Sequence, residues 1–150
     1  MDIEYISNNP PQTESIGADY AGMLPRGSIV LLTGDLGAGK TCFSRGFINS
    51  YFPGTLVSSP TFTLLNEYKN DQLTILHYDL YRLKTAEEAA ELGIEDMISR
   101  ADYTLIEWPE TAEPLIEGNI YRVTVRMGAA EKERIILVEG DFAWKPSVSE

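Results

Sequence analysis

The 150-residue chain has one cysteine, Cys42, and no long apolar run. A single thiol cannot form an internal disulfide, so nothing in the sequence indicates an oxidising compartment. No apolar stretch approaches the roughly 18 residues that cross a bilayer, and the N-terminus lacks a basic segment followed by an apolar one. We therefore expect a cytoplasmic protein that does not enter a membrane.

Positive charge is also scarce. Lys and Arg number 12 against 23 Asp and Glu, which gives a net charge of −11. Nucleic-acid binding commonly needs about 6 to 10 cationic phosphate contacts on one face, so direct contact with DNA or RNA is disfavoured. Ten acidic residues and only one basic residue, Arg100, lie between Glu87 and Glu117. This segment is either a solvated face or a surface that docks on a basic protein, and the sequence leaves both open.

Because the sequence has no repeats, low-complexity tracts or Gly/Ser-rich linkers, we expect a single domain over residues 1–150. Apolar periodicity and turn residues predict alternating strands and helices. An opening strand around Ile3 and Tyr5 ends at a proline-containing break, and Thr13 caps the helix that follows. Ser28–Thr33 is a nearly continuous apolar run, typical of a central strand that is covered on both faces.

The later elements continue this alternation. They are a helix carrying Phe43, Phe47 and Tyr51, strands at 62–68 and 73–78, a helix from Thr85 to Gly93, a strand at 103–106, and a hairpin of 121–127 with 134–138. Together they predict an α/β fold in which helices flank a central mixed, mainly parallel sheet, with an antiparallel C-terminal hairpin.

Gly34–Thr41 fits the phosphate-loop pattern G-x-x-x-x-G-K-[ST]. Glycines let backbone amides converge on one anion, and the N-terminus of the following helix favours negative charge. Lys40 adds a point charge for the β- and γ-phosphates, and the Thr41 hydroxyl can complete the coordination of Mg²⁺. Since a buried strand precedes the loop and an amphipathic helix follows it, the sequence predicts a P-loop NTPase fold that binds Mg·ATP. The predicted nucleotide-binding residues here are Asp35, Leu36, Gly37, Ala38, Gly39, Lys40, Thr41 and Cys42.

Two carboxylates, Asp79 and Glu107, each follow an apolar strand. Carboxylates at the tips of strands beside a phosphate loop are typical of a Mg·nucleotide site. With Thr41 they are the predicted metal ligands, and with Lys40 they are the predicted catalytic residues. Either could hold the metal or orient the attacking water, and that choice stays open. His77 has no second metal-type residue at a fixed spacing, so no role is predicted for it.

Five motifs, in order along the chain, resemble those of the bacterial TsaE family, also called YjeE. This family is the ATPase component of the machinery that makes threonylcarbamoyladenosine in tRNA. The motifs are Gly34–Thr41, Ser59–Thr63, His77–Leu83, Glu91–Ile94 and Glu107–Glu110.

The resemblance implies roles for particular positions. Thr41, Asp79 and Glu107 are its metal and catalytic positions, and Ser59–Thr63 behaves like a nucleotide-sensing switch. Trp108 would lie against the nucleotide. The N-terminal loop from Asn9 to Thr13 would cover the adenine. Cys42 stands where the family often has a second Thr, and we interpret it as a small buried thiol.

Protein partners are implied as well. Members of the family dock on the TsaB and TsaD proteins, and their ATP hydrolysis supports repeated cycles of tRNA modification, so tRNA would be met only through the complex. An arginine finger is worth about 10³ to 10⁵ in rate, and no Arg is obviously placed to supply one. Arg45 is held on the helix after the loop. Arg82 is the better internal candidate, and support of the switch loop or of a partner interface is an equally open role for it. We therefore expect slow hydrolysis by the isolated chain.

Competing classes of P-loop protein have weaker support. A small-molecule kinase needs arginines in a closing lid, and no Arg-rich lid segment is visible. The Asn-Lys-x-Asp element of GTPases and the Leu-Ser-Gly-Gly-type signature of ABC ATPases are both missing from the sequence. A non-enzymatic scaffold that holds a nucleotide also remains open.

Overall fold

The computed structural model describes residues 2–139, which fall into two compact units. Within that range, unit 1 contains residues 2–24, 33–58 and 122–139, and unit 2 contains residues 25–32 and 59–121. The single domain expected over residues 1–150 would include both units, and it stays a prediction. None of the helices in the described range is both long and apolar enough to cross a bilayer.

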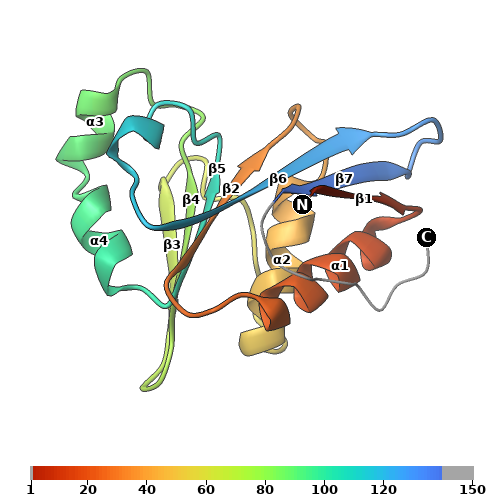
Figure 1. The fold of residues 1–150 in the computed structure, drawn as a ribbon, viewed down its shortest axis with the longest axis horizontal. Helices are drawn as coiled ribbons and strands as arrows, with labels where there is room; N and C mark the ends of the chain where they lie inside the picture. Colours follow the sequence, from red (N-terminus) through yellow and green to blue (C-terminus); the bar gives the residue numbers. More distant parts are fainter. Residues whose placement is uncertain (1, 140–150) are drawn as a thin grey trace. The chain divides into compact units, whose positions relative to one another are not determined.

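Unit 1 contains three adjacent antiparallel strands in the order β1-β7-β6 (Figure 1). Their bounds are Asp2–Ser7 for β1, Arg134–Glu139 for β7 and Asn119–Met127 for β6, the first three residues of β6 lying in unit 2. The register pairs Ile136 with both Tyr5 and Val125, and all three side chains are buried. Buried positions alternate with more exposed ones along the hairpin. The predicted C-terminal hairpin is therefore confirmed.

Two helices of unit 1 pack against one another: α1 (Pro10–Met23) and α2 (Lys40–Tyr51). Glycines permit the close approach. A Cβ added to Gly17 would lie 2.3 Å from the carbonyl oxygen of Phe43, and one added to Gly46 would lie 1.9 Å from that of Glu14. The rings of Tyr20 and Phe43 are buried at this contact, 5.7 Å apart. Any larger residue at either glycine would force the two helices apart.

The start of α1 differs from the prediction, which had Thr13 as the cap. Asn9 is the N-cap, and its side chain accepts a hydrogen bond of 2.9 Å from the backbone amide three residues later. Pro10 and Pro11 occupy the first helical positions, where a fixed φ suits the helix and an N–H is not needed. Thr13 lies buried in the first turn, with its hydroxyl 2.7 Å from that of Ser7. The prolines that were predicted to break the chain therefore begin the helix.

Unit 2 contains four strands in the order β2-β5-β4-β3. β2, β5 and β4 are parallel, and β3 runs antiparallel to β4. The bounds are Ser28–Thr33 for β2, whose last residue lies in unit 1, Tyr103–Glu107 for β5, Thr74–Asp79 for β4 and Leu65–Lys69 for β3. Every residue of β5 is buried, as expected of a strand covered on both faces. Phe62, predicted to lie in the strand, precedes β3 in a turn.

Three helical segments accompany these strands: α3 (Ala86–Glu91), α4 (Ile94–Arg100) and the 3₁₀ helix η1 (Glu113–Leu115). The predicted cap is confirmed, because the Thr85 hydroxyl accepts a hydrogen bond of 3.2 Å from the amide of Glu88. The helix ends two residues before Gly93. That glycine has a φ of 68° and serves as the N-cap of α4, a helix that was not predicted. Ile94 packs in the same buried cluster as Leu76 and Ile106.

Candidate functional site

The segment between β2 and α2 is a loop whose shape depends on glycine. Gly34, Gly37 and Gly39 have φ angles of 143°, 80° and 115°, which residues with a Cβ rarely adopt. A Cβ on Gly34 would also lie 2.1 Å from the carbonyl oxygen of Val125, so this residue packs directly on the backbone of β6. A Cβ on Gly37 would meet open space. The loop is thus closely packed at Gly34, and at Gly37 it leaves space for a ligand.

Lys40 begins α2 and is only 4% exposed. Its Nζ donates hydrogen bonds to the carbonyl oxygens of Gly34 and Asp35, at 2.5 and 3.1 Å. The side chain therefore folds back over the loop. It brings a positive charge to the N-terminus of α2, where backbone amides already favour an anion. Thr41 follows in the first turn of α2 and is half-buried.

A cavity of about 290 Å³ adjoins the loop, which is close to the lower limit of about 300 Å³ for typical small-molecule sites. The loop and α2 contribute Gly37, Gly39 and Cys42, and the first turn of α1 contributes Pro10 and Thr13. The other lining residues are all cationic: Arg45, Lys132 and Arg134. In a chain with a net charge of −11, three cations around one cavity favour an anionic ligand. Residues 9–13, expected as a covering loop, are the cap and first turn of α1.

Cys42 is half-buried, and its Sγ donates to the carbonyl oxygen of Pro10 at 3.4 Å. Burial raises the pKa of this thiol and nearby Glu14 raises it further, while Arg45 and Arg134 lower it. A raised pKa keeps the thiol protonated and weakly nucleophilic. The Cys42 side chain is less buried than expected, and its raised pKa is not typical of a reactive cysteine.

Asp79 ends β4 and is 3% exposed. Its Oδ2 accepts hydrogen bonds from the hydroxyls of Ser59 and Thr61, at 2.6 and 3.0 Å. Its Oδ1 accepts from the backbone amide of Tyr81 at 3.0 Å. These three donors hold the carboxylate in one orientation. Two residues of the predicted switch, Ser59–Thr63, therefore contact a predicted metal ligand directly.

Glu107 ends β5 beside Asp79, because the parallel register pairs the two residues. Its Oε2 lies 2.6 Å from Nε2 of His77, and both side chains are buried. Within residues 2–139, Nδ1 of His77 has no hydrogen-bond partner. No role was predicted for this histidine. The alternation of β4, which puts His77 and Asp79 on one face, was the signal that could have identified it.

Trp108 follows Glu107 and has a φ of 56°, a strained value for a residue with a side chain, and such residues cluster at functional sites. Its ring packs edge-on against Tyr81, with centroids 4.8 Å apart. Phe62 of the switch segment is 83% exposed, and the guanidinium of Arg82 lies 5.4 Å from its ring centroid. Unit 2 thus carries a group of partly exposed aromatic side chains together with Arg82.

In the described part of the chain, no group of three or more His, Cys, Asp or Glu side chains could hold a metal. Mg²⁺ is usually bound by one or two protein carboxylates together with substrate phosphates and waters, and seldom by an all-protein cage. The neighbouring carboxylates of Asp79 and Glu107 fit that donor pattern.

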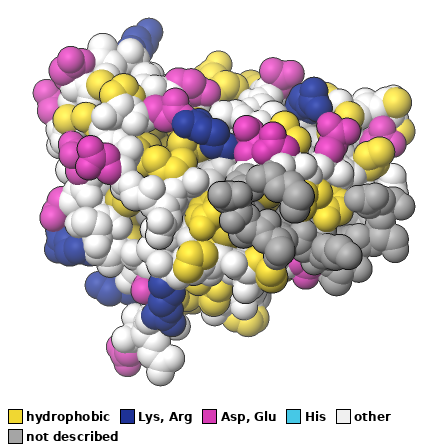
Figure 2. Space-filling model, viewed as in Figure 1, with side chains coloured by type: hydrophobic (Ala, Val, Ile, Leu, Met, Phe, Trp, Pro, Cys, Tyr) yellow, Lys and Arg dark blue, Asp and Glu magenta, His cyan; other side chains and the backbone are white. Residues whose placement is uncertain are grey.

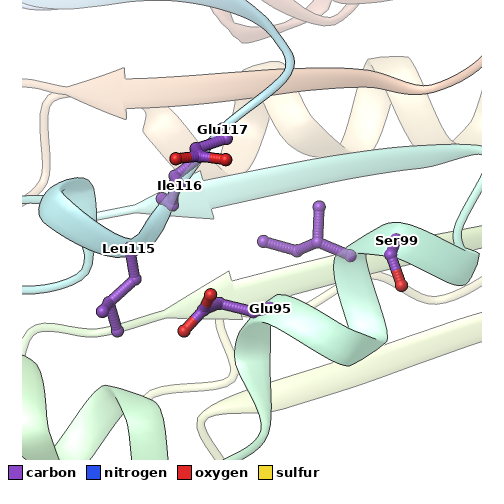
Figure 3. Close-up of a pocket in the computed structure, with 6 residues that line it drawn as sticks. Glu95, Ser99, Leu115, Ile116 and Glu117 are labelled. Carbon is purple, nitrogen blue, oxygen red and sulfur yellow. The ribbon is translucent and has the colours of Figure 1, made fainter.

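A second cavity, of about 210 Å³, lies in unit 2 and contains none of the predicted site residues (Figure 3). It is lined by Glu95, Ile98 and Ser99 of α4 and by Leu115, Ile116 and Glu117. Acidic side chains also lie exposed over α3 and α4 (Figure 2). This distribution agrees with a solvated acidic face, and docking on a basic partner stays open.

The predicted residues thus lie in two groups. Unit 1 holds the loop residues and Cys42, beside the cationic cavity. Unit 2 holds Asp79 and Glu107 side by side, and Trp108 next in the chain. Two contacts were not predicted: that of His77 with Glu107, and the hydrogen bond of 2.8 Å from Nε of Arg134 to the carbonyl oxygen of Ala38 in the loop.

The loop is shaped by glycines, and it joins a buried strand to a helix that begins with a lysine. This arrangement is that of the α/β proteins with the P-loop fold. The crystal structure of YdiB from Bacillus subtilis shares this fold with a TM-score of 0.76. It is 27% identical in sequence, and the match covers 92% of this chain and 84% of that one. The predicted fold class is therefore confirmed.

The family model for the threonylcarbamoyl adenosine biosynthesis protein TsaE matches residues 7–136. The tRNA threonylcarbamoyladenosine biosynthesis protein TsaE of Rickettsia bellii is 46% identical over 127 residues, which is 80% of this chain and 87% of the relative. The protein of the same name from Bacillus subtilis is 33% identical over 132 residues, 87% and 82% of the two chains. The chain belongs to the TsaE family, and the resemblance seen in its motifs is confirmed.

Proposed function

We propose that this chain binds Mg·ATP, hydrolyses it slowly, and thereby supports the threonylcarbamoyladenosine modification of tRNA. The observation that carries the proposal is the phosphate loop. Three of its glycines have positive φ, Lys40 folds back over it, and a cavity with three cationic residues adjoins it. Membership of the TsaE family supports the link to tRNA modification.

Each part of the proposed site has a task. The backbone amides of residues 37–41 and the Lys40 ammonium bind the β- and γ-phosphates. The cavity lined by Cys42 and Thr13 takes the nucleoside end of ATP. Thr41, Asp79 and Glu107 would hold the Mg²⁺, which would supply positive charge against the charge that develops on the phosphoryl group. One of the two carboxylates orients the attacking water.

Replacing Lys40 with Ala tests nucleotide binding. We expect no measurable ATP affinity in titration calorimetry with Mg²⁺ present, because the variant loses the point charge that contacts the phosphates. Lys69→Ala, at an exposed lysine that ends β3, is the matched control and should bind like the original chain. Equal ATP affinity in the two variants would refute the assignment of the loop.

The positions of the arginines support the proposal of slow hydrolysis. Arg45 lies in α2, as predicted, and its side chain donates to the carbonyl oxygen of Val57 at 3.3 Å. Arg82 is exposed and stacks over Phe62, so it is the better candidate for a residue that a partner reorients. We propose that the TsaB and TsaD proteins are those partners and that nucleotide state controls docking.

The partner proposal is tested by phosphate release with and without TsaB and TsaD. We expect a much faster rate with both proteins, and Phe62→Ser should weaken that stimulation. An isolated chain that already turns over at the stimulated rate would contradict partner activation. Capture of TsaB and TsaD with and without ATP shows whether docking depends on the nucleotide.

A non-enzymatic scaffold and a small-molecule kinase are the alternatives. Glu107→Gln separates the scaffold from the ATPase, because an ATPase should lose phosphate release and retain ATP binding. For the kinase, incubation with a metabolite panel should yield a phosphorylated product without release of phosphate.

A further inference from the structure

Arg134, the first residue of β7, connects the turn of the β6–β7 hairpin to the phosphate loop. Its Nε donates a hydrogen bond of 2.8 Å to the carbonyl oxygen of Ala38. Its Nη1 donates to the carbonyl oxygens of Glu131 and Glu133, at 2.8 and 2.9 Å. One guanidinium therefore holds three backbone carbonyls from two segments that are distant in the sequence.

The contact with Ala38 determines where the next amide points. In a planar trans peptide the C=O and the following N–H lie on opposite sides. Holding the Ala38 carbonyl toward Arg134 therefore turns the N–H of Gly39 away from that arginine. Gly39 has a φ of 115° and no side chain to restrain it, so the peptide would otherwise rotate easily.

The hairpin is a firm anchor for this contact. In its turn, the Gly128 amide donates to the Glu133 carbonyl at 2.8 Å, and the Ala129 amide donates to the Glu133 side chain at 2.9 Å. The same hairpin touches the loop a second time, since Gly34 packs on the backbone of Val125 in β6. Strand β6 thus supports the start of the loop, and Arg134 supports its end.

We propose that Arg134 is a positioning residue for the phosphate loop, which fixes the Ala38–Gly39 peptide so that the Gly39 amide is oriented to bind the nucleotide phosphates. The inference rests on the proposed ATP binding. A preformed loop binds more tightly because less order must be imposed when the ligand arrives. Arginine suits the task because its planar group donates in several fixed directions, whereas lysine presents a single ammonium.

The test compares Arg134→Gln with a matched arginine of the same hairpin. Arg126 lies in β6, is exposed, and pairs with Glu4 at 3.3 Å. We expect ATP affinity, measured by calorimetry with Mg²⁺, to fall at least tenfold for Arg134→Gln and to stay within twofold for Arg126→Gln. Arg134→Lys should lie between the two, and it replaces the Gln variant if that variant does not fold. Unchanged affinity in a folded Arg134 variant would overturn the inference.

Arg134 also lines the cavity, so a direct contact with the nucleotide must be distinguished from positioning. Backbone amide resonances and relaxation of residues 37–40, recorded without nucleotide, make that distinction. We expect Arg134→Gln to shift the Gly39 amide and to increase its mobility, with the amides of β6 and of residues 136–139 in β7 unchanged. Weaker ATP binding with undisturbed loop amides would assign Arg134 to the nucleotide itself and overturn positioning. If the unaltered chain bound no ATP, the proposed function would fail, and the amide comparison alone would decide the inference.

Discussion

The phosphate loop of unit 1 and the carboxylate pair of unit 2 are built in different ways. The loop takes its shape from the main chain, through glycines at positive φ and a carbonyl held by Arg134. The two carboxylates are held in place mainly by side chains. Asp79 accepts hydrogen bonds from two hydroxyls, and Glu107 is hydrogen-bonded to His77. A single added Cβ should therefore damage the loop, whereas the carboxylate pair should lose its order gradually, one hydrogen bond at a time.

The loop gives the largest expected effect. In Gly34→Ala the new Cβ would lie 2.1 Å from the Val125 carbonyl oxygen, at a φ of 143°. Backbone strain and overpacking together should lower the free energy of unfolding by about 3 kcal/mol. ATP affinity should fall below detection. Urea unfolding and calorimetry measure the two effects.

Gly37→Ala is the matched control for the loss of stability expected in Gly34→Ala. Its φ of 80° is also positive, but its Cβ would meet nothing within 4 Å. Only the conformational cost of about 1 kcal/mol then remains. If both variants lost stability equally, packing on β6 would not be what distinguishes Gly34, and the loop would be shaped by its own conformation alone.

The second prediction concerns the carboxylate pair. His77→Leu removes the buried hydrogen bond to Glu107, so the free energy of unfolding should fall by about 2 kcal/mol, as for a bond to a charged group. His77→Gln keeps an N–H donor and should recover part of that loss. Urea unfolding of both variants checks the prediction. Identical stabilities would mean that the histidine fills space without holding the carboxylate.

This difference also explains how much could be predicted from the sequence. The loop is encoded locally, since Gly34, Gly37, Gly39 and Lys40 are neighbours in the chain and their spacing alone indicates a phosphate site. The ends of β4 and β5 were predicted because each acid follows an apolar run. That Asp79 and Glu107 are paired depends on the parallel register.

Contacts between distant segments could not be predicted in the same way. Nothing local distinguishes Arg134 from Arg126, and only the folded hairpin brings the former to Ala38. The start of α1 was wrong because Pro10 and Pro11 were interpreted as a break, although proline suits the first turn of a helix. Gly93 was interpreted as a helix end, and its left-handed conformation in fact joins α3 to α4.

The third prediction tests the switch contacts of Asp79 and should give a smaller effect. Thr61→Val and Ser59→Ala each remove one hydroxyl donor and should cost about 1 kcal/mol of unfolding free energy. The double variant should cost less than the sum of the two, because the hydroxyls also lie 2.9 Å from one another. Thr63→Val, at an exposed residue of the same segment, is the control. Strict additivity in urea unfolding would show that the two hydroxyls act independently.

The smallest effect should be seen at Cys42, the one cysteine of the chain, which makes alkylation a specific probe of the loop cavity. Because burial raises its pKa, less thiolate is present at pH 8 than in the unfolded chain, so iodoacetamide should react more slowly with the folded protein. The rate should rise as the pH increases above the ordinary value for cysteine. Mass spectrometry of the folded chain and of the chain in urea measures both rates. Mg·ATP should slow the reaction further if the nucleoside occupies this cavity, whereas an unchanged rate at saturating ATP would place the nucleoside elsewhere.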